Sequence, residues 1–298
     1  MIDFHTPTIA DKDWINKKIC ETGSPSCEYT FGNIFAYSAK MDLKVAEFAD
    51  CLITRCIYGD DIMYCYPMGN GDKKAAVEAI IRDSEAFDSD FVIFGLTKDF
   101  ADELEGLFPD RFKIIFDRDG SDYIYNSADL INLIGKKYQP KRNHISFFKK
   151  NYDWSYEKIT ADNIAECIAM NEKWIEESLN ERKDELYEEL EIIKLVFENY
   201  DALGFVGGLI RVDGEVIAYT MGERMNEDTF CVHFEKAFSK YRGAYPMINR
   251  EFSENALSSY KYIDREDDLG IDNLRKAKLS YYPVIIREEY EAKLKNAD

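Results

Sequence analysis

The chain has 298 residues, of which 46% are hydrophobic and 14% aromatic, and its formal charge is −19. This composition is typical of a folded protein and excludes intrinsic disorder, while the net acidity excludes binding of a polyanion through the general field of the molecule. The length suits two domains of about 150 residues each.

The cysteines and the N-terminus indicate a cytoplasmic protein. Seven cysteines, an odd number, lack C-x-x-C spacing, which predicts reduced thiols. Only three histidines are present, and we expect none to pair with a cysteine at ligand spacing, so no metal site is predicted. The chain opens without a basic and apolar leader, and no apolar run reaches the roughly 18 residues that a membrane span needs.

The first half of the chain is predicted to mix strands and helices. A hairpin is expected at Cys51–Tyr58 and 61–67, and a helix begins after 70–72, where Asn-Gly-Asp stands. The apolar run Phe91–Leu96 predicts a buried strand, and the helix Lys98–Leu107 follows it. Two further strands, 113–116 and 123–125, are predicted around a turn at Asp119-Gly120, before a helix at 127–134 that ends near Gly135.

Residues 135–152 form a strongly basic stretch without any acidic residue. Its six cations are Lys136, Lys137, Lys141, Arg142, Lys149 and Lys150. Pro140 suits the first turn of a helix, and Ile145, Phe148 and Tyr152 make an apolar stripe opposite the cations. The pattern predicts an amphipathic helix that connects two domains, 1–135 and 136–298, and offers a local surface to an anionic partner. The alternative is a solvated basic face that is docked on acidic neighbours.

The second half has a regular order of elements, β-α-α-β-β-β-loop-α-β-α-β. The expected strands and helices are at 155–159, 160–178, 183–200, 204–212, 215–223, 229–236, 247–257, 260–264, 271–279 and 282–288. This order indicates a mixed α/β fold and resembles the Gcn5-related acyltransferase fold. In that fold the loop after the fourth strand leads into a helix whose free N–H groups hold a pyrophosphate.

The corresponding loop here is a second basic island. Its cations are Lys236, Lys240, Arg242 and Arg250, and Gly243 allows close approach of the backbone to an anion. The acyl-CoA loop usually reads R/Q-x-x-G-x-G/A, whereas this chain has Tyr245 at a position for a small residue and Pro246, which lacks an N–H. The loop therefore predicts a general phosphate site, with a purely structural use of the glycine as the alternative. We expect the basic connector and the turn at Gly243 to lie together along one cleft.

Two further patterns carry ionisable side chains. On the strand at 229–236, Cys231, His233 and Glu235 alternate onto one face, so that a buried Glu235 is a candidate general base; alternatively Glu235 pairs with Arg242 or Arg250.

In the segment 264–283, Arg275 and Lys278 are three residues apart and suited to grip an anion, and Tyr281 or Tyr282 is a candidate proton donor. The alternative is a helix whose terminal charges simply complement its dipole.

The chain resembles the soluble bacterial proteins grouped with the C-terminal domain of phosphatidylglycerol lysyltransferase. The resemblance rests on YIYNSADLINLIGKKYQPKRNHISFFKKNY, HFEKAFSKYRGAYPMINREF and DREDDLGIDNLRKAKLSYYP, and it covers nearly the whole chain. It implies two tandem Gcn5-type domains, as in the Fem-type peptidyltransferases that use aminoacyl-tRNA. The membrane-spanning half of the lysyltransferase has no counterpart, which leaves the acceptor open among a small molecule, a peptide and a lipid.

Three functions follow as hypotheses. In the first, an acyl- or aminoacyltransferase uses aminoacyl-tRNA, with Glu235 as base and Tyr281 as acid. The groups expected to contact the donor and its phosphates are Lys136, Lys137, Lys141, Arg142, Lys240, Arg242, Gly243, Arg275 and Lys278. The second is an N-acetyltransferase that takes acyl-CoA as donor, and the third is an anion-binding protein that keeps the fold without catalysis.

Overall fold

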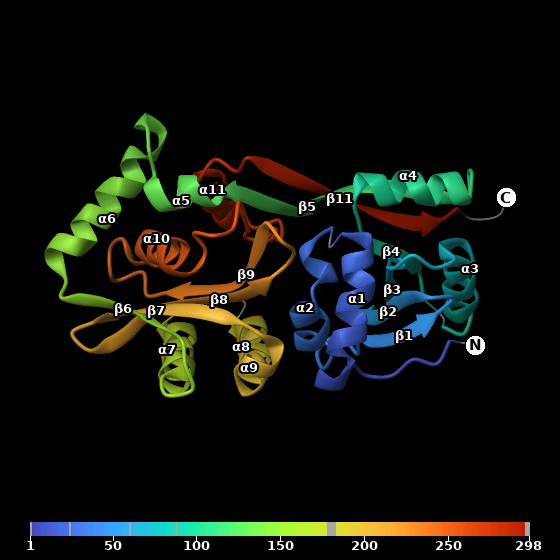
Figure 1. The fold of residues 1–298 in the computed structure, drawn as a ribbon, viewed down its shortest axis with the longest axis horizontal. Coiled ribbons are helices and arrows are strands. Elements are labelled where there is room, and N and C mark those ends of the chain that lie inside the picture. The colour runs from blue at the N-terminus through green and yellow to red at the C-terminus, as the bar shows by residue number, and fades with distance from the viewer. Residues whose placement is uncertain (1, 24, 60, 88, 178–182, 296–298) are drawn as a thin grey trace. The chain divides into compact units, whose positions relative to one another are not determined.

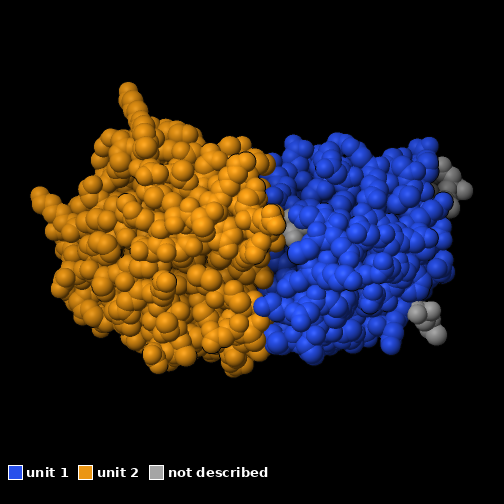
Figure 2. Space-filling model, viewed as in Figure 1, with its two compact units in different colours: residues 1–122, 267–275, 286–298 blue, residues 123–266, 276–285 orange. Residues whose placement is uncertain are grey.

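The computed structural model describes residues 2–295 apart from 24, 60, 88 and 178–182, and it divides into two compact units (Figure 2). Unit 1 contains residues 1–122, 267–275 and 286–298, and unit 2 contains residues 123–266 and 276–285. The chain therefore passes from one unit to the other several times, and the predicted boundary at residue 135 falls within unit 2.

Unit 1 is a mixed sheet with helices. Its helices are α1 (Lys12–Thr22), α2 (Phe31–Ala36), α3 (Lys73–Ser84) and α4 (Lys98–Leu107). The strands follow the order β1 (Lys44–Phe48), β2 (Cys51–Tyr58), β3 (Asp61–Cys65), β4 (Phe91–Leu96) and β11 (Ile285–Leu294). Strands β3 and β4 are parallel and the other neighbours antiparallel, so this sheet is mixed.

Unit 2 is also a mixed sheet, covered by helices on both faces. Its strands follow the order β5 (Phe112–Asn126, of which 123–126 belong to this unit), β10 (Tyr262–Asp264), β9 (Thr229–Ala237), β8 (Glu215–Arg224), β7 (Val206–Val212) and β6 (Trp154–Lys158). Its helices are α5 (Ser127–Asn132), α6 (Gln139–Asn151), α7 (Ile164–Glu177), α8 (Lys183–Glu198), α9 (Tyr200–Leu203), α10 (Ala244–Ala256) and the end of α11 (Asp272–Leu279). Figure 1 shows α10 on one side of β7–β9 and α7 and α8 on the other.

The predicted mixed α/β character is confirmed, and most elements of the second half lie within a few residues of their expected positions. Helix α6 has Pro140 in its first turn, as expected, and Asp213 and Gly214, both with positive φ, form the two-residue turn between β7 and β8. The predicted end of a helix at residue 178 lies outside the described residues.

The predicted turn at Asp119-Gly120 was wrong. Strand β5 runs without interruption through these two residues, and neither of them has the positive φ that a two-residue hairpin turn requires. The side chain of Asp117 instead accepts hydrogen bonds from both of their amides, at 3.0 and 3.1 Å. An Asp-Gly pair can therefore be satisfied locally within a strand.

Candidate functional site

Strand β9 contains an inserted residue at the centre of unit 2. Its pairing with β8 shifts between Val232 and Phe234, so His233 has no direct partner opposite it. An insertion of this kind is a β-bulge, and it interrupts the alternation of side chains along the strand.

The bulge separates three side chains that were predicted to share a face. Cys231 and His233 remain together, with Sγ 3.7 Å from Nδ1. Glu235 instead reaches Asn249 of α10, the helix that Phe230 also contacts. The predicted common face was therefore wrong, because the alternation on which it rested holds only for a regular strand.

Glu235 forms an ion pair with Arg265, the residue that follows β10. Arg265 Nη2 donates to Glu235 Oε1 at 2.9 Å, and Asn249 Nδ2 donates to Oε2 at 3.4 Å. The two charged side chains are only 11% and 13% exposed. One alternative from the sequence paired Glu235 with Arg242 or Arg250, but neither of these arginines is its partner in this ion pair.

The second edge of the Arg265 guanidinium group is unsatisfied. Its Nη1 is buried and has no hydrogen-bond partner among the residues that the structure describes. A buried N–H group without a partner costs about 1–3 kcal/mol, and more when it is charged. A buried donor without a partner needs an explanation. One explanation is a ligand that accepts a hydrogen bond from Nη1.

Two predicted residues, Tyr281 and Lys141, surround this guanidinium group. The ring of Tyr281 lies 5.2 Å from Arg265 Cζ and 3.8 Å from Lys141 Nζ, so that one aromatic face meets two cations. Burial raises the pKa of Tyr281, which keeps its hydroxyl protonated. Burial, helped by the charge of Arg265 and opposed by Glu235, lowers the pKa of Lys141 to about 8.

The backbone that carries Arg265 is held firmly. Lys278 Nζ donates to the Arg265 carbonyl at 2.6 Å, and the Lys278 carbonyl accepts from Tyr125 Oη at 2.9 Å. Glu266 has a positive φ of 56°, and its N–H is held by Asp264 Oδ1 at 2.9 Å. Lys278 thus acts here as a brace for the Arg265 backbone.

Arg275 does not join Lys278 in gripping one anion. It belongs to unit 1, where Nε and Nη2 donate to the two carboxylate oxygens of Asp268 at 2.8 and 2.6 Å. Nη2 also donates to Asp119 at 2.6 Å. The carboxylates of the protein itself therefore occupy this arginine.

The basic stretch divides into structural and exposed cations. Arg142 donates to the carbonyls of Leu133 and Gly135, and Lys149 Nζ lies 2.9 Å from Glu251. Lys136 and Lys137 remain exposed.

One of these exposed cations, Lys137, borders the aromatic residues next to Tyr281. Lys137 Nζ lies 5.0 Å from the ring of Tyr282 and 4.8 Å from that of Tyr138. Within unit 2, positive charge thus extends from exposed lysines through the half-buried Lys141 to Arg265.

The basic connector and the turn at Gly243 meet by direct packing. Gly243 has a φ of 95°, and a Cβ at this position would lie 2.5 Å from the carbonyl oxygen of His144 in α6. Arg242 packs over Phe147 at 4.5 Å, and Lys240 pairs with Glu177 at 2.9 Å. These contacts favour the structural use of the glycine, because a side chain at residue 243 would collide with α6.

Unit 1 offers an open hollow of about 380 Å³ at the start of α3. Asp72, which lines it, accepts from the Ala75 N–H at 2.9 Å, and Lys73 pairs with Glu103 at the same distance. Because these charged groups have protein partners, the unsatisfied Arg265 in unit 2 remains the better candidate for a site.

Arg265 and Asn249 were missed in the sequence. Both stand inside the segments that carry the family resemblance, but neither has a spacing that signals its role. The site forms when the residue after β10 meets β9 and α10, and only the fold brings these segments together.

Comparison with known proteins shows the relationship of the chain. A family model described as phosphatidylglycerol lysyltransferase, C-terminal, matches residues 22–293. A curated relative, an uncharacterized protein of Mycoplasmoides gallisepticum, is 26% identical over 208 residues, which are 65% of this chain and 65% of the relative. The match therefore spans less than two thirds of that protein.

Solved structures agree with this relationship. A conserved protein of unknown function from Bacteroides thetaiotaomicron is 39% identical, with 99% of this chain and 100% of that chain covered and a TM-score of 0.93. L-PGS of Bacillus licheniformis is 13% identical, with 95% of this chain and 92% of that chain covered and a TM-score of 0.64. FemX is 10% identical, covers 97% of each chain, and has a TM-score of 0.62. The predicted fold class of tandem Gcn5-type domains is confirmed. No helix within the described residues has both the length and the apolar character of a membrane span.

Proposed function

Because the chain belongs to the family of the C-terminal domain of phosphatidylglycerol lysyltransferase, we propose that it is an aminoacyltransferase whose donor is aminoacyl-tRNA. The observation that supports this function is the unpartnered Nη1 of Arg265 beside Tyr281 and Lys141. When an amine or hydroxyl attacks an ester, negative charge develops on the carbonyl oxygen. Donors fixed in a site with little water stabilise that charge strongly.

Each residue of the site has its own role in the proposed reaction. Arg265 Nη1 donates to the developing oxyanion, while Glu235 and Lys278 hold its side chain and backbone in place. With a pKa of about 8, Lys141 carries a proton in most molecules at neutral pH, and it passes that proton to the leaving ribose oxygen. Tyr281 stays protonated and is a second donor within the site.

Glu235 remains our proposed general base. Its Oε1 is bound to Arg265, whereas Oε2 accepts the longer hydrogen bond, 3.4 Å, from Asn249. Oε2 is therefore the oxygen suited to take a proton from the attacking amine or hydroxyl. No covalent enzyme intermediate is needed, so catalysis rests on positioning and on charge stabilisation.

The exposed Lys136 and Lys137 would meet the phosphates of the donor, close to the ester that they deliver. This arrangement would let so acidic a chain handle a polyanion, because the contact is made locally by a stretch that contains no acidic residue.

The test is a single-turnover assay of ester loss from charged tRNA. Total tRNA carrying labelled amino acids is incubated with the full chain and with amine, peptide or phosphatidylglycerol-vesicle acceptors. Arg265→Lys keeps the positive charge but loses the planar guanidinium group that can donate to Glu235 and to the oxyanion at once. We expect about 10²-fold slower ester loss. Arg275→Lys is the matched control and should react at the wild-type rate. An Arg265→Lys rate equal to wild type, or no protein-dependent ester loss with any acceptor, would refute the proposal.

The CoA-dependent alternative receives less support from the geometry. Its pyrophosphate would need the start of α10, where Gly243 packs on the His144 carbonyl and Pro246 lacks an N–H. A ligand at 100 times its Kd stabilises a protein by about 2.7 kcal/mol. We therefore expect no thermal shift with millimolar acetyl-CoA, and a clear shift would restore this alternative.

A further inference from the structure

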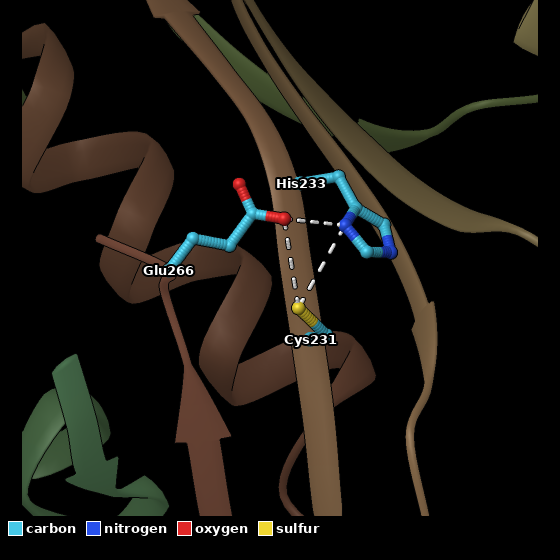
Figure 3. Close-up of side chains that lie close together, drawn as sticks. All are labelled: Cys231, His233 and Glu266. Carbon is cyan, nitrogen blue, oxygen red and sulfur yellow. Dashed lines mark hydrogen bonds and ion pairs between the residues drawn. The ribbon is translucent and has the colours of Figure 1, made fainter. Parts of the chain in front are cut away.

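A second cluster of unit 2 contains a thiol, an imidazole and a carboxylate. Cys231 and His233 come from β9, and Glu266 follows the neighbouring parallel strand β10 (Figure 3). His233 Nδ1 lies 2.7 Å from Glu266 Oε1, and Cys231 Sγ lies 3.7 Å from His233 Nδ1 and 3.9 Å from Glu266 Oε1. Cys231 and His233 are two residues apart on β9 and stay together despite the bulge at His233.

These distances fit a small ion with tetrahedral geometry. Bonds of about 2.3 Å to sulfur and 2.0 Å to nitrogen or oxygen place the ligand atoms roughly 3.3–3.5 Å from one another. The two sulfur distances exceed this range slightly, and the 2.7 Å distance is a hydrogen bond that an ion would open. Small side-chain rotations are therefore enough to receive the ion.

The other imidazole nitrogen has the partner that a metal-binding histidine usually has. His233 Nε2 lies 3.2 Å from Glu223 Oε1, on the neighbouring strand β8. A carboxylate in this position favours the tautomer in which Nε2 carries the proton, so that Nδ1 can bind a metal once its hydrogen bond with Glu266 opens. The ring of Phe205 stacks on the imidazole at 5.4 Å and holds its plane.

Burial of the cluster is uneven. Cys231 is fully buried and the His233 side chain is 1% exposed, whereas Glu266 is 24% exposed. A buried thiolate without a cation would be costly, so the thiol is suited to act as a ligand only when an ion is present. The exposed side of Glu266 gives the ion a way in and leaves a fourth position for water.

We propose that Cys231, His233 and Glu266 bind a divalent ion of the zinc class, with Glu223 orienting His233. Nothing in this assignment depends on aminoacyl transfer. It would also tie Glu266 to β9 and so fix the backbone next to Arg265.

The test uses the full chain with the exposed Cys20 replaced by serine, which removes an adventitious thiol ligand. After treatment with a chelator, the protein is titrated with Co²⁺, and Zn²⁺ is then added as competitor. We expect one equivalent of cobalt with a thiolate-to-metal absorption band that zinc removes. Cys231→Ser should abolish the band, and Cys167→Ser, a buried thiol of α7, should keep it.

Two further variants keep the proposal falsifiable if Cys231→Ser does not fold. Glu223→Gln should weaken zinc binding 10- to 100-fold without changing the cobalt band, because it alters only the orienting partner. Glu266→Gln should weaken zinc binding at least tenfold. Absence of a cobalt band in the Cys20→Ser protein, a band that persists in Cys231→Ser, or zinc affinity unchanged in Glu266→Gln would overturn the assignment.

Discussion

Two arginines ten residues apart differ in how completely they are paired. Arg275 in unit 1 donates to both oxygens of Asp268 and to Asp119, and Asp268 is fully buried. Arg265 in unit 2 donates to Glu235 and leaves Nη1 buried without a partner among the described residues. The comparison teaches that an arginine surrounded by carboxylates stabilises a fold, whereas one with an empty buried edge marks a place for a ligand.

The largest expected effect on stability comes from removing each arginine in turn. Arg275→Met leaves the buried Asp268 without its main partner, and we expect a loss of about 3 kcal/mol. Arg265→Met leaves Glu235 with the hydrogen bond from Asn249, but it also removes an unsatisfied donor and the repulsion with Lys141, so its cost should be smaller. Urea unfolding of both variants measures the difference. Equal losses in free energy of unfolding would mean that Arg265 stabilises the fold as much as Arg275 does.

Replacing Gly243 by alanine tests whether the turn before α10 serves packing or anion binding. Alanine would be held at a strained positive φ and its Cβ would meet the His144 carbonyl at 2.5 Å, so we expect a loss of about 2–3 kcal/mol. Gly214→Ala is the control, because it has a φ of 86° with nothing within 4 Å and should lose only about 1 kcal/mol. If the two variants lose the same free energy of unfolding, the contact between α6 and the turn at Gly243 does not contribute to stability.

The depressed pKa of Lys141 makes stability depend on pH. Its folded pKa is about 8 against an ordinary 10.5, so between these values the unfolded chain binds more protons and stability rises with pH. Lys141→Met should therefore be more stable than wild type at pH 7, by about 1–2 kcal/mol after allowance for partial exposure, and this advantage should shrink towards pH 10.5.

The control for that measurement is Lys150→Met, which removes an exposed charge from the same helix. Unfolding free energies of the three proteins across pH 7–10.5 give the comparison. A difference between Lys141→Met and wild type that does not change with pH would show that Lys141 is not buried beside Arg265.

The smallest effect concerns the exposed lysines. Lys136→Ala combined with Lys137→Ala should weaken tRNA binding uniformly across sequences and lower the slope of log K against log salt by about 1 for each lysine removed. The control carries the same charge change in unit 1, as Lys98→Ala with Lys113→Ala. Equal slopes in the two double variants would contradict a phosphate contact at Lys136 and Lys137.

Local sequence signals predicted much of the fold. The apolar run of β4, the Pro140 at the start of α6 and the turn at Asp213-Gly214 were all read correctly, because each depends on neighbouring residues. The first fifty residues were left without predicted elements, although they contain α1, α2 and β1. Strand β1 has only five residues and offers too short a pattern to recognise.

The candidate site could be predicted only in part. Glu235, Lys141 and Tyr281 were singled out, and the structure brings them around one guanidinium group. Arg265 itself was missed, because an arginine between two acidic residues looks like ordinary surface charge. The bulge at His233 was missed as well, since register is set by the pairing of β9 with β8 and not by the sequence of one strand.

The most direct test of the central claim is a crystal structure of the full chain with a non-hydrolysable 3′-aminoacylamino-adenosine. We predict that its carbonyl oxygen lies about 3 Å from Arg265 Nη1, within hydrogen-bond distance, with the amide beside Lys141. An analogue bound elsewhere, with Arg265 Nη1 satisfied by a protein group, would contradict the account.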